Sequence, residues 1–141
     1  IKRNDDGIIT VTGGKLTTYR RMAEDAVDLI TDTKCRTTQI PLVGAGPRPT
    51  NPDIPQRLIS RYGSEAQIVA SIADTDPTLL EPLHPHVPTL GVEIVFAVTA
   101  EGALTFDDVT ERRTRLSLVP EDLAKATPRI TQILESLDFP S

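Results

Sequence analysis

The residues best suited to chemistry stand together in one short run, TVTGGKLTTYRRM, at residues 10–22. Two glycines, a lysine and two threonines join a strand-like segment to the start of a helix. Glycine permits backbone conformations that other residues avoid, and the first turn of a helix leaves N–H groups unpaired. Together with the cations Lys15, Arg20 and Arg21, these groups can bind an anion or an electron-rich ring.

The same run has a second interpretation, in which a glycine turn leads into an ordinary amphipathic helix. Cations in a first helical turn oppose the helix dipole, which favours a bound anion that compensates them. Spacing alone leaves both interpretations with equal weight. A phosphate-binding loop of the Walker type is excluded, because that motif needs Gly and Ser or Thr where this chain has Ile9 and Leu16.

Three other features carry weaker signals. Gly44 and Gly46 lack the third glycine of a dinucleotide fingerprint, and Pro47 follows where a helix should begin, so a linker is favoured. His84 and His86 are too few for a metal site and are expected in a solvated loop. No His lies near Cys35 in the sequence to activate it as a nucleophile, which favours an inert thiol. We therefore predict no catalytic residue and no metal site.

A basic cluster of Arg112, Arg113 and Arg115 lies on a predicted helix, and the neighbouring helix carries Glu93 and Glu101. A phosphate site is conceivable here. Ion pairs between the helices, or a contact between domains, explain the cluster with fewer assumptions.

A short strand and one amphipathic helix must position the glycine–lysine run. Residues 8–11 are mostly apolar and lie between turn residues, as in a strand, and residues 1–3 can pair with them. Over residues 19–30, apolar side chains recur every three or four positions, which predicts a helix with one apolar face. Ion pairs from Arg20 and Arg21 are expected on its other face.

Beyond a proline-rich connector at residues 34–56, the pattern is helical. Glycine and threonine mark the ends of the helices: Gly63 and Gly102 as stops, Thr105 as an N-terminal cap. Residues 77–88 are expected to form a proline-rich loop. The predicted helices cover residues 54–62, 66–73, 92–99, 105–116 and a last segment from 120, which Pro128 kinks or splits.

The sequence therefore predicts a mainly α fold, a small helical bundle preceded by a short strand or hairpin remnant and one long amphipathic helix. We expect residues 1–33 to end one domain, residues 34–53 to be a linker and residues 54–141 to form a helical domain. The chain has 141 residues, of which 38% are hydrophobic, enough for a modest core. Since it begins with Ile rather than Met, we expect a segment of a longer protein.

Charge and cysteine content exclude several functional classes. A formal net charge of −5 disfavours a general nucleic-acid binder. The single cysteine, Cys35, can form no disulfide within the chain, which favours a reducing, cytoplasmic compartment. No apolar run approaches the roughly 20 residues that span a bilayer, so we expect a soluble chain.

Long stretches of the chain resemble the aerobic, FAD-dependent glycerol-3-phosphate dehydrogenases. DGIITVTGGKLTTYRRMAEDAVDLI is similar to the end of that family's flavin domain. CRTTQIPLVGA, RLISRYGSEA and EIVFAVTAEGALTFDDVTERRTRL resemble its C-terminal helical domain, in the same order. The first stretch is specific, whereas the helical ones are individually weak. Thr99 and Gly102 depart from the family pattern, in which Arg and bulkier residues are usual.

The resemblance implies roles for individual residues. In the family, the Gly-Gly-Lys-Leu-Thr-Thr segment closes over the flavin ring, and its lysine faces the substrate. Lys15 would therefore hold glycerol 3-phosphate. A helix start aimed at the flavin would also stabilise the negative charge that reduction places on the ring. The implied flavin contacts are Gly13, Gly14, Leu16, Thr17 and Thr18.

The resemblance also implies a reaction and partners. Hydride would pass from glycerol 3-phosphate to FAD, giving dihydroxyacetone phosphate, and electrons would leave to a quinone. The family's N-terminal portion supplies most cofactor and catalytic groups, so these residues alone should retain little FAD and be inactive. Peripheral association with the inner face of the membrane and a homodimer stay open.

Two alternatives remain beside this reading. The first is a glycerol-3-phosphate oxidase, in which oxygen is the electron acceptor. The second, from a different class, makes the helical part an interaction or structural module that braces the flavin domain.

Overall fold

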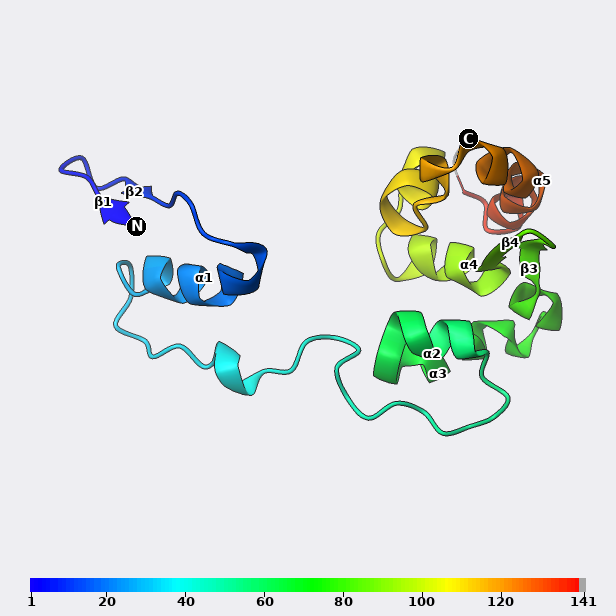
Figure 1. The fold of residues 1–141 in the computed structure, drawn as a ribbon, viewed down its shortest axis with the longest axis horizontal. Coiled ribbons are helices and arrows are strands. Elements are labelled where there is room, and N and C mark those ends of the chain that lie inside the picture. Colours follow the sequence, from blue (N-terminus) through cyan, green and yellow to red (C-terminus); the bar gives the residue numbers. More distant parts are fainter. Residues whose placement is uncertain (140–141) are drawn as a thin grey trace. The chain divides into compact units, whose positions relative to one another are not determined.

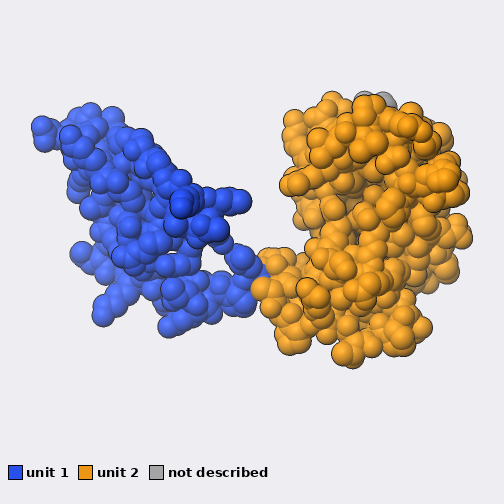
Figure 2. All heavy atoms as spheres, in the orientation of Figure 1, with its two compact units in different colours: residues 1–42 blue, residues 43–141 orange. Residues whose placement is uncertain are grey.

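A computed structural model describes residues 1–139 and is mainly helical, as predicted (Figure 1). The chain divides into two compact units, unit 1 (Ile1–Leu42) and unit 2 (Val43–Ser141) (Figure 2). No helix among the described residues combines the length and the apolar content needed to cross a bilayer.

Unit 1 contains a small hairpin and one helix. Strands β1 (Lys2–Arg3) and β2 (Ile9–Thr10) pair in antiparallel register, which confirms the predicted hairpin. A 3₁₀ turn (Leu16–Thr18) leads into α1 (Tyr19–Val27), so the predicted amphipathic helix is present and ends three residues early.

Unit 1 has no buried core. None of residues 1–42 is buried, and the apolar face of α1 lies open, with Tyr19 54% and Val27 49% exposed. Two strands of two residues and a nine-residue helix are marginal without tertiary packing. Helix α1 would therefore gain stability if its apolar face packed against another surface.

Unit 2 is built around α4 (Gly91–Thr99), which Figure 1 shows between the α2–α3 pair and α5. Both sides of α4 are buried: Val92 packs with the α2–α3 cluster, and Ile94 packs with the α5 cluster. A helix that is apolar on all sides belongs in the middle of a fold. The surrounding helices are α2 (Gln56–Tyr62), α3 (Ala66–Ser71) and α5 (Pro120–Ser136).

The proline-rich segment at residues 77–88 was predicted as a loop, and this prediction is wrong. The structure has a 3₁₀ turn (Pro77–Leu80) followed by a hairpin of β3 (Pro82–His84) and β4 (Val87–Leu90). Leu83 and Val87 are buried under α5, whereas the prolines at 82 and 88 are exposed. In a two-stranded sheet a proline can lie where no ladder hydrogen bond is needed, so burial of the apolar residues decides the structure.

The predicted helix at residues 105–116 is shorter than expected, and most of it is a π-helix, which has a wider turn than an α-helix. The Thr105 cap is confirmed, since its hydroxyl accepts the Asp108 N–H at 3.1 Å. The Asp108 carboxylate accepts the N–H groups of Leu104 and Thr105, and these bonds lower the pKa of Asp108. The following turn is a π-helix (Asp108–Arg113), and it ends before Arg115, which has a left-handed φ of 60°.

Pro128 does not split the last helix. Helix α5 runs without interruption from Pro120 to Ser136. Pro128 is exposed, while Ile130 and Ile133 on the inner face are buried. The proline ring thus lies on the solvent side, and the apolar contacts of the inner face hold the helix together.

A glycine contact fastens the end of the proline-rich connector to unit 2. The carbonyl of Gly44 accepts the N–H of Ser64 at 3.1 Å, and the N–H of Gly46 donates to the Ser64 hydroxyl at 3.3 Å. Gly63, which follows α2 as predicted, has φ 58° and ψ −123°. A Cβ at Gly63 would lie 2.1 Å from the Gly44 oxygen. The two backbones can approach this closely only because both residues are glycine.

Candidate functional site

Two adjacent glycines turn the chain between β2 and α1. Gly13 and Gly14 have φ of 76° and 96°, a region that other residues adopt with strain. A Cβ on Gly13 would touch nothing, so this position faces open space. A Cβ on Gly14 would lie 2.1 Å from Met22 Sδ, so the Gly14 backbone rests directly on the Met22 side chain.

The Lys15 backbone is held by Thr18. The Lys15 N–H donates to Thr18 Oγ1 at 3.0 Å, and the Lys15 carbonyl accepts both the Thr18 N–H and the Thr18 hydroxyl at 2.9 Å. The N–H groups of Gly14, Leu16 and Thr17 donate to no group within residues 1–139. These three donors are available to a ligand.

The cations near the turn differ in their ion pairs: Arg20 and Arg21 are paired, and Lys15 is not paired with any described residue. Arg20 pairs with Glu24 at 3.0 Å, and Arg21 pairs with Glu24 and Asp25 at 3.0 Å, as predicted for the polar face of α1. The hydrogen bond from Arg20 lowers the pKa of Glu24. Lys15 has no ion pair with any described residue, so its charge is the one left to a ligand.

The residues of this turn are exposed and border a shallow hollow. A shallow hollow of about 420 Å³ is lined by Val11, by Gly13, Gly14 and Lys15 of the turn, and by residues of α1 that include Tyr19. Leu16 is 89% exposed, and Thr17 and Thr18 are also exposed. A bare glycine backbone and an unpaired lysine lie in this hollow, and the free amides of Leu16 and Thr17 follow directly in the chain; donors of this kind can bind an anion. The run is neither buried nor inside a continuous helix.

The weaker candidates form no site. Cys35 is half-buried, and its sulfur lies 3.0 Å from Thr37 Oγ1. His84 and His86 flank the turn of the β3–β4 hairpin, where the His86 N–H donates to His84 Nδ1 at 3.2 Å. Among residues 1–139, no group of three or more His, Cys, Asp or Glu side chains could hold a metal ion.

The basic cluster is mostly engaged in structure. Arg112 pairs with Asp108, four residues earlier, at 2.8 Å. Arg113 Nε donates to the backbone carbonyl of Glu101 at 2.9 Å, which links the π-helix to the segment that follows α4. The predicted ion pairs with Glu93 and Glu101 are absent in the described residues, because Glu93 is already paired with arginines of α2.

That carboxylate, Glu93, is an important residue that the sequence did not reveal. Its side chain has no exposed surface and accepts bonds from Arg57 and Arg61 of α2 and from the N–H of Leu90. Arg57 also donates to Thr89 at 3.1 Å. An acidic residue in the first turn of a helix was the only available signal. The cluster joins α2 to α4 and has a structural role.

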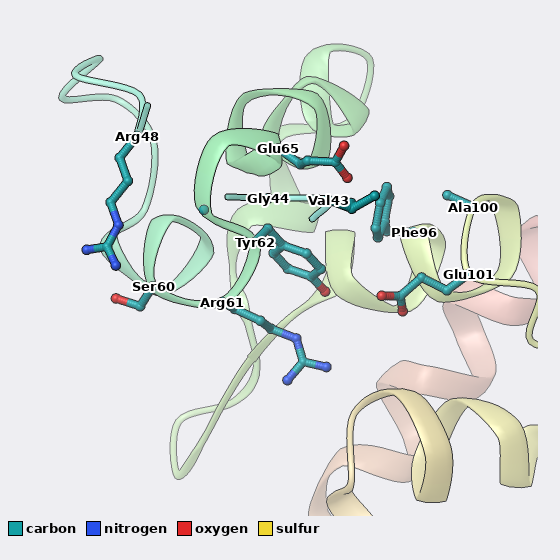
Figure 3. A pocket seen from close by; sticks show the side chains of 11 residues that line it. Val43, Gly44, Arg48, Ser60, Arg61, Tyr62, Glu65, Phe96, Ala100 and Glu101 are labelled. Carbon is teal, nitrogen blue, oxygen red and sulfur yellow. The ribbon is translucent and has the colours of Figure 1, made fainter. Parts of the chain in front are cut away.

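A polar pocket of about 450 Å³ lies beside this cluster (Figure 3). Figure 3 shows the Tyr62 hydroxyl turned toward the side of the pocket that carries Glu101, with Phe96 beyond it. The Tyr62 and Phe96 rings meet edge to face at 5.3 Å. The Tyr62 hydroxyl is buried and has no hydrogen-bond partner within residues 1–139. Burial, reinforced by the negative charges of Glu93 and Glu101, raises the pKa of Tyr62 to about 12.

We expect Tyr62→Phe to stabilise unit 2 by about 1 kcal/mol at neutral pH, because it removes a buried group that lacks a partner. The fold raises the pKa of Tyr62, so between about pH 10 and 12 the phenol is ionised in the unfolded wild type and stays neutral in the folded one. The free energy of unfolding of the wild type should therefore fall as the pH rises through this range. Urea unfolding between pH 7 and 12 should show this loss in the wild type and a smaller one in Tyr62→Phe. Equal losses in the two proteins would contradict the prediction, and Tyr19→Phe, at an exposed position, is the control.

Comparisons with known proteins match most of the chain. The family described as the C-terminal domain of alpha-glycerophosphate oxidase matches residues 35–137. Glycerol-3-phosphate dehydrogenase 1 of Mycobacterium tuberculosis is 44% identical in an alignment of 128 positions that covers 82% of this chain. A probable mitochondrial glycerol-3-phosphate dehydrogenase of Dictyostelium discoideum is 33% identical in an alignment of 158 positions, gaps included, that covers 97% of this chain.

These relatives are much longer than this chain. The matched region is 24% of the mycobacterial protein and 24% of the Dictyostelium protein, so the chain spans about a quarter of their length. No solved structure shows a significant match to the chain. The match to the Dictyostelium protein extends over nearly all of both units.

Proposed function

The chain belongs to the glycerol-3-phosphate dehydrogenase family, as its C-terminal portion, and on this premise we propose that it completes an FAD-dependent glycerol-3-phosphate dehydrogenase. The homologues named as dehydrogenases support an oxidoreductase. One observation of the structure carries the proposal furthest. Two left-handed glycines and the unpaired Lys15 line one shallow hollow, and the exposed residues Leu16 and Thr17, whose amides are unpaired, follow directly in the chain.

We assign the backbone of Gly13, Gly14 and Leu16 to the flavin. In this assignment the free amides of Leu16 and Thr17 face the flavin edge that gains negative charge on reduction. The absence of a Cβ at Gly13 allows a planar ring to lie against the backbone. Thr18, the last residue of the Gly-Gly-Lys-Leu-Thr-Thr segment, is assigned to the same flavin-binding turn.

Lys15 is assigned to the substrate. Its ammonium group is unpaired within the described residues and can hold an oxygen or the phosphate of glycerol 3-phosphate. Bound FAD would supply the hydride acceptor. The product would be dihydroxyacetone phosphate, and a quinone is the proposed electron acceptor. Oxygen is the alternative acceptor, since the matched family is described from an oxidase.

The division of the chain into two units is consistent with a place at the C-terminal end of a longer enzyme. We propose that residues 1–33 end the flavin-binding domain, that residues 34–53 are the linker and that residues 54–141 form the C-terminal domain. The uncovered apolar face of α1 fits this division, because packing against the rest of a flavin domain would bury it. The 141 residues alone should then neither retain FAD well nor turn over substrate.

A second function is favoured for unit 2 by its own buried core. Two apolar clusters hold it together without residues of unit 1. We propose that unit 2 braces the flavin domain or offers an interaction surface, and that it carries no reacting group. Deleting unit 2 from the full-length protein should then lower the melting temperature more than it changes substrate preference.

The full-length protein tests the proposal directly. After purification it should contain FAD, and glycerol 3-phosphate should bleach the flavin absorbance under anaerobic conditions. Glycerol without phosphate should not do so at the same concentration. A purified protein that holds no flavin, or whose flavin is not bleached, would refute the assignment. Peroxide yield with and without a quinone then separates the dehydrogenase from the oxidase.

We expect Lys15→Ala in the full-length protein to lower kcat/KM for glycerol 3-phosphate by at least about tenfold, since a charge-assisted bond to substrate contributes about 1.5–3 kcal/mol. FAD content should remain that of the wild type. Lys2→Ala, in the hairpin, is the matched control. Unchanged kcat and KM for Lys15→Ala would rule out the substrate role.

A further inference from the structure

Thr18 has an unusual set of contacts for an exposed residue. Its hydroxyl accepts the Lys15 N–H at 3.0 Å and donates to the Lys15 carbonyl at 2.9 Å. The same oxygen lies 3.5 Å from Met22 Sδ, the atom on which Gly14 rests. The Thr18 side chain thus binds both polar backbone groups of Lys15 and also contacts the Met22 side chain, against which Gly14 packs.

These bonds decide which amides are left for a ligand. The Lys15 N–H is occupied by Thr18 Oγ1, and the Thr18 N–H is occupied by the Lys15 carbonyl. The two N–H groups between them, those of Leu16 and Thr17, donate to no described residue. Because neighbouring amides in a tight turn point to the same side, the pair forms a small anion-binding concavity.

The bonds also fix the backbone from which the lysine side chain starts. Lys15 has φ −130° and ψ 156°, an extended conformation directly before the 3₁₀ turn. Without the Thr18 hydroxyl, the Lys15 N–H would have no partner among residues 1–139, and the Lys15 carbonyl would keep only the bond from the Thr18 N–H. The turn would then be held less firmly, since a three-residue 3₁₀ turn has little stability of its own. Nothing else within residues 1–139 binds the Lys15 N–H.

Building on the proposed function, we propose that Thr18 is a positioning residue. Its side chain holds the Lys15 backbone so that the Leu16 and Thr17 amides face the flavin while the Lys15 ammonium group faces the substrate. The only proton of the hydroxyl is donated to the Lys15 carbonyl, and the hydroxyl oxygen accepts the Lys15 N–H, so in this proposal the hydroxyl serves Lys15 and not the flavin. Thr18 therefore acts through its neighbours.

Three variants of the full-length protein test this inference. Thr18→Val keeps the shape of the side chain and removes the hydroxyl, whereas Thr18→Ser keeps the hydroxyl. Thr38→Val is the matched control, because Thr38 is an exposed threonine of unit 1 outside the glycine–lysine run. For each protein we would measure the FAD dissociation constant by flavin fluorescence, the rate of anaerobic flavin bleaching against glycerol 3-phosphate concentration, and the melting temperature.

Thr18→Val should raise the FAD dissociation constant, and the concentration of substrate that gives half-maximal bleaching, about five- to tenfold, as expected for one lost hydrogen-bonding group. Thr18→Ser should stay within about twofold of the wild type, and Thr38→Val should match it. The melting temperatures should agree within a few degrees.

The outcomes separate the inference from the proposed function. If the wild type binds FAD and is bleached by substrate while Thr18→Val behaves identically, the inference is overturned and the proposed function stands. If Thr18→Ser is impaired as strongly as Thr18→Val, the hydroxyl has no positioning role and the inference is again overturned. A wild type that binds no FAD overturns both.

Discussion

Replacing Glu93 by alanine is expected to lower the free energy of unfolding of unit 2 by about 3 kcal/mol. The carboxylate is fully buried and joins Arg57 and Arg61 of α2 to the first turn of α4. It also accepts the Leu90 N–H at 2.9 Å, which caps that helix. The variant leaves a buried N–H without a partner and two arginines without their counter-charge. Arg57 and Arg61 can still reach water, which keeps the loss at the lower end of the range for buried pairs.

Urea unfolding followed by far-ultraviolet circular dichroism measures this change in the whole chain. Glu111→Ala is the matched control, because Glu111 is exposed on the π-helix and should change the unfolding free energy by less than about 0.5 kcal/mol. Glu93→Gln should fall between Glu93→Ala and the wild type, since an amide oxygen can still accept from Leu90. An unfolding free energy for Glu93→Ala within 1 kcal/mol of the wild type would show that the cluster adds little.

Gly63→Ala is expected to destabilise unit 2 by about 3 kcal/mol and to release the end of the connector. Two effects add. The backbone at Gly63 has φ 58° and ψ −123°, which a residue with a Cβ adopts only with strain. The new methyl carbon would also lie 2.1 Å from the Gly44 carbonyl oxygen, a backbone atom that cannot turn away. The two segments must separate, which breaks the bond from Ser64 to Gly44.

The chain contains a control that separates strain from the clash. Gly102 also has a positive φ, 69°, but a Cβ there would meet no atom within 4 Å. Gly102→Ala should therefore show only the conformational term, about 1 kcal/mol. Limited proteolysis near Arg48 should accelerate in Gly63→Ala and not in Gly102→Ala. Equal unfolding midpoints for the two variants would mean that the approach of Gly44 to Gly63 contributes nothing.

Most helices were predictable because their ends carry local signals. Gly63 ends α2, and the cap at Thr105 fixes the start of the next turn of helix, since both act through residues a few positions away. The β3–β4 hairpin was missed, because its prolines read as a loop and only the burial of Leu83 and Val87 under α5 reveals strands. The π-helix gave no local signal. Long-range packing decides both.

The candidate site divides in the same way. The glycine turn and the start of α1 could be predicted from residues 13–19, because both depend on residues that are adjacent in the sequence. The two hydrogen bonds between the Thr18 hydroxyl and the Lys15 backbone were not predicted, because they depend on the conformation of the turn. The partners of Glu93 lie 36 residues away in Arg57 and in the next turn of α2, a pairing that no spacing rule predicts.

The chain has two tyrosines and no tryptophan, and each unit holds one of the two phenol rings. Tyr19 stands on the open face of α1 beside the glycine turn, and Tyr62 lies against Phe96 next to the Gly44–Gly63 contact. Ultraviolet emission from this chain therefore comes from two chromophores in different surroundings. A single substitution to phenylalanine leaves one built-in optical reporter, which allows the melting of either half to be followed without an attached dye.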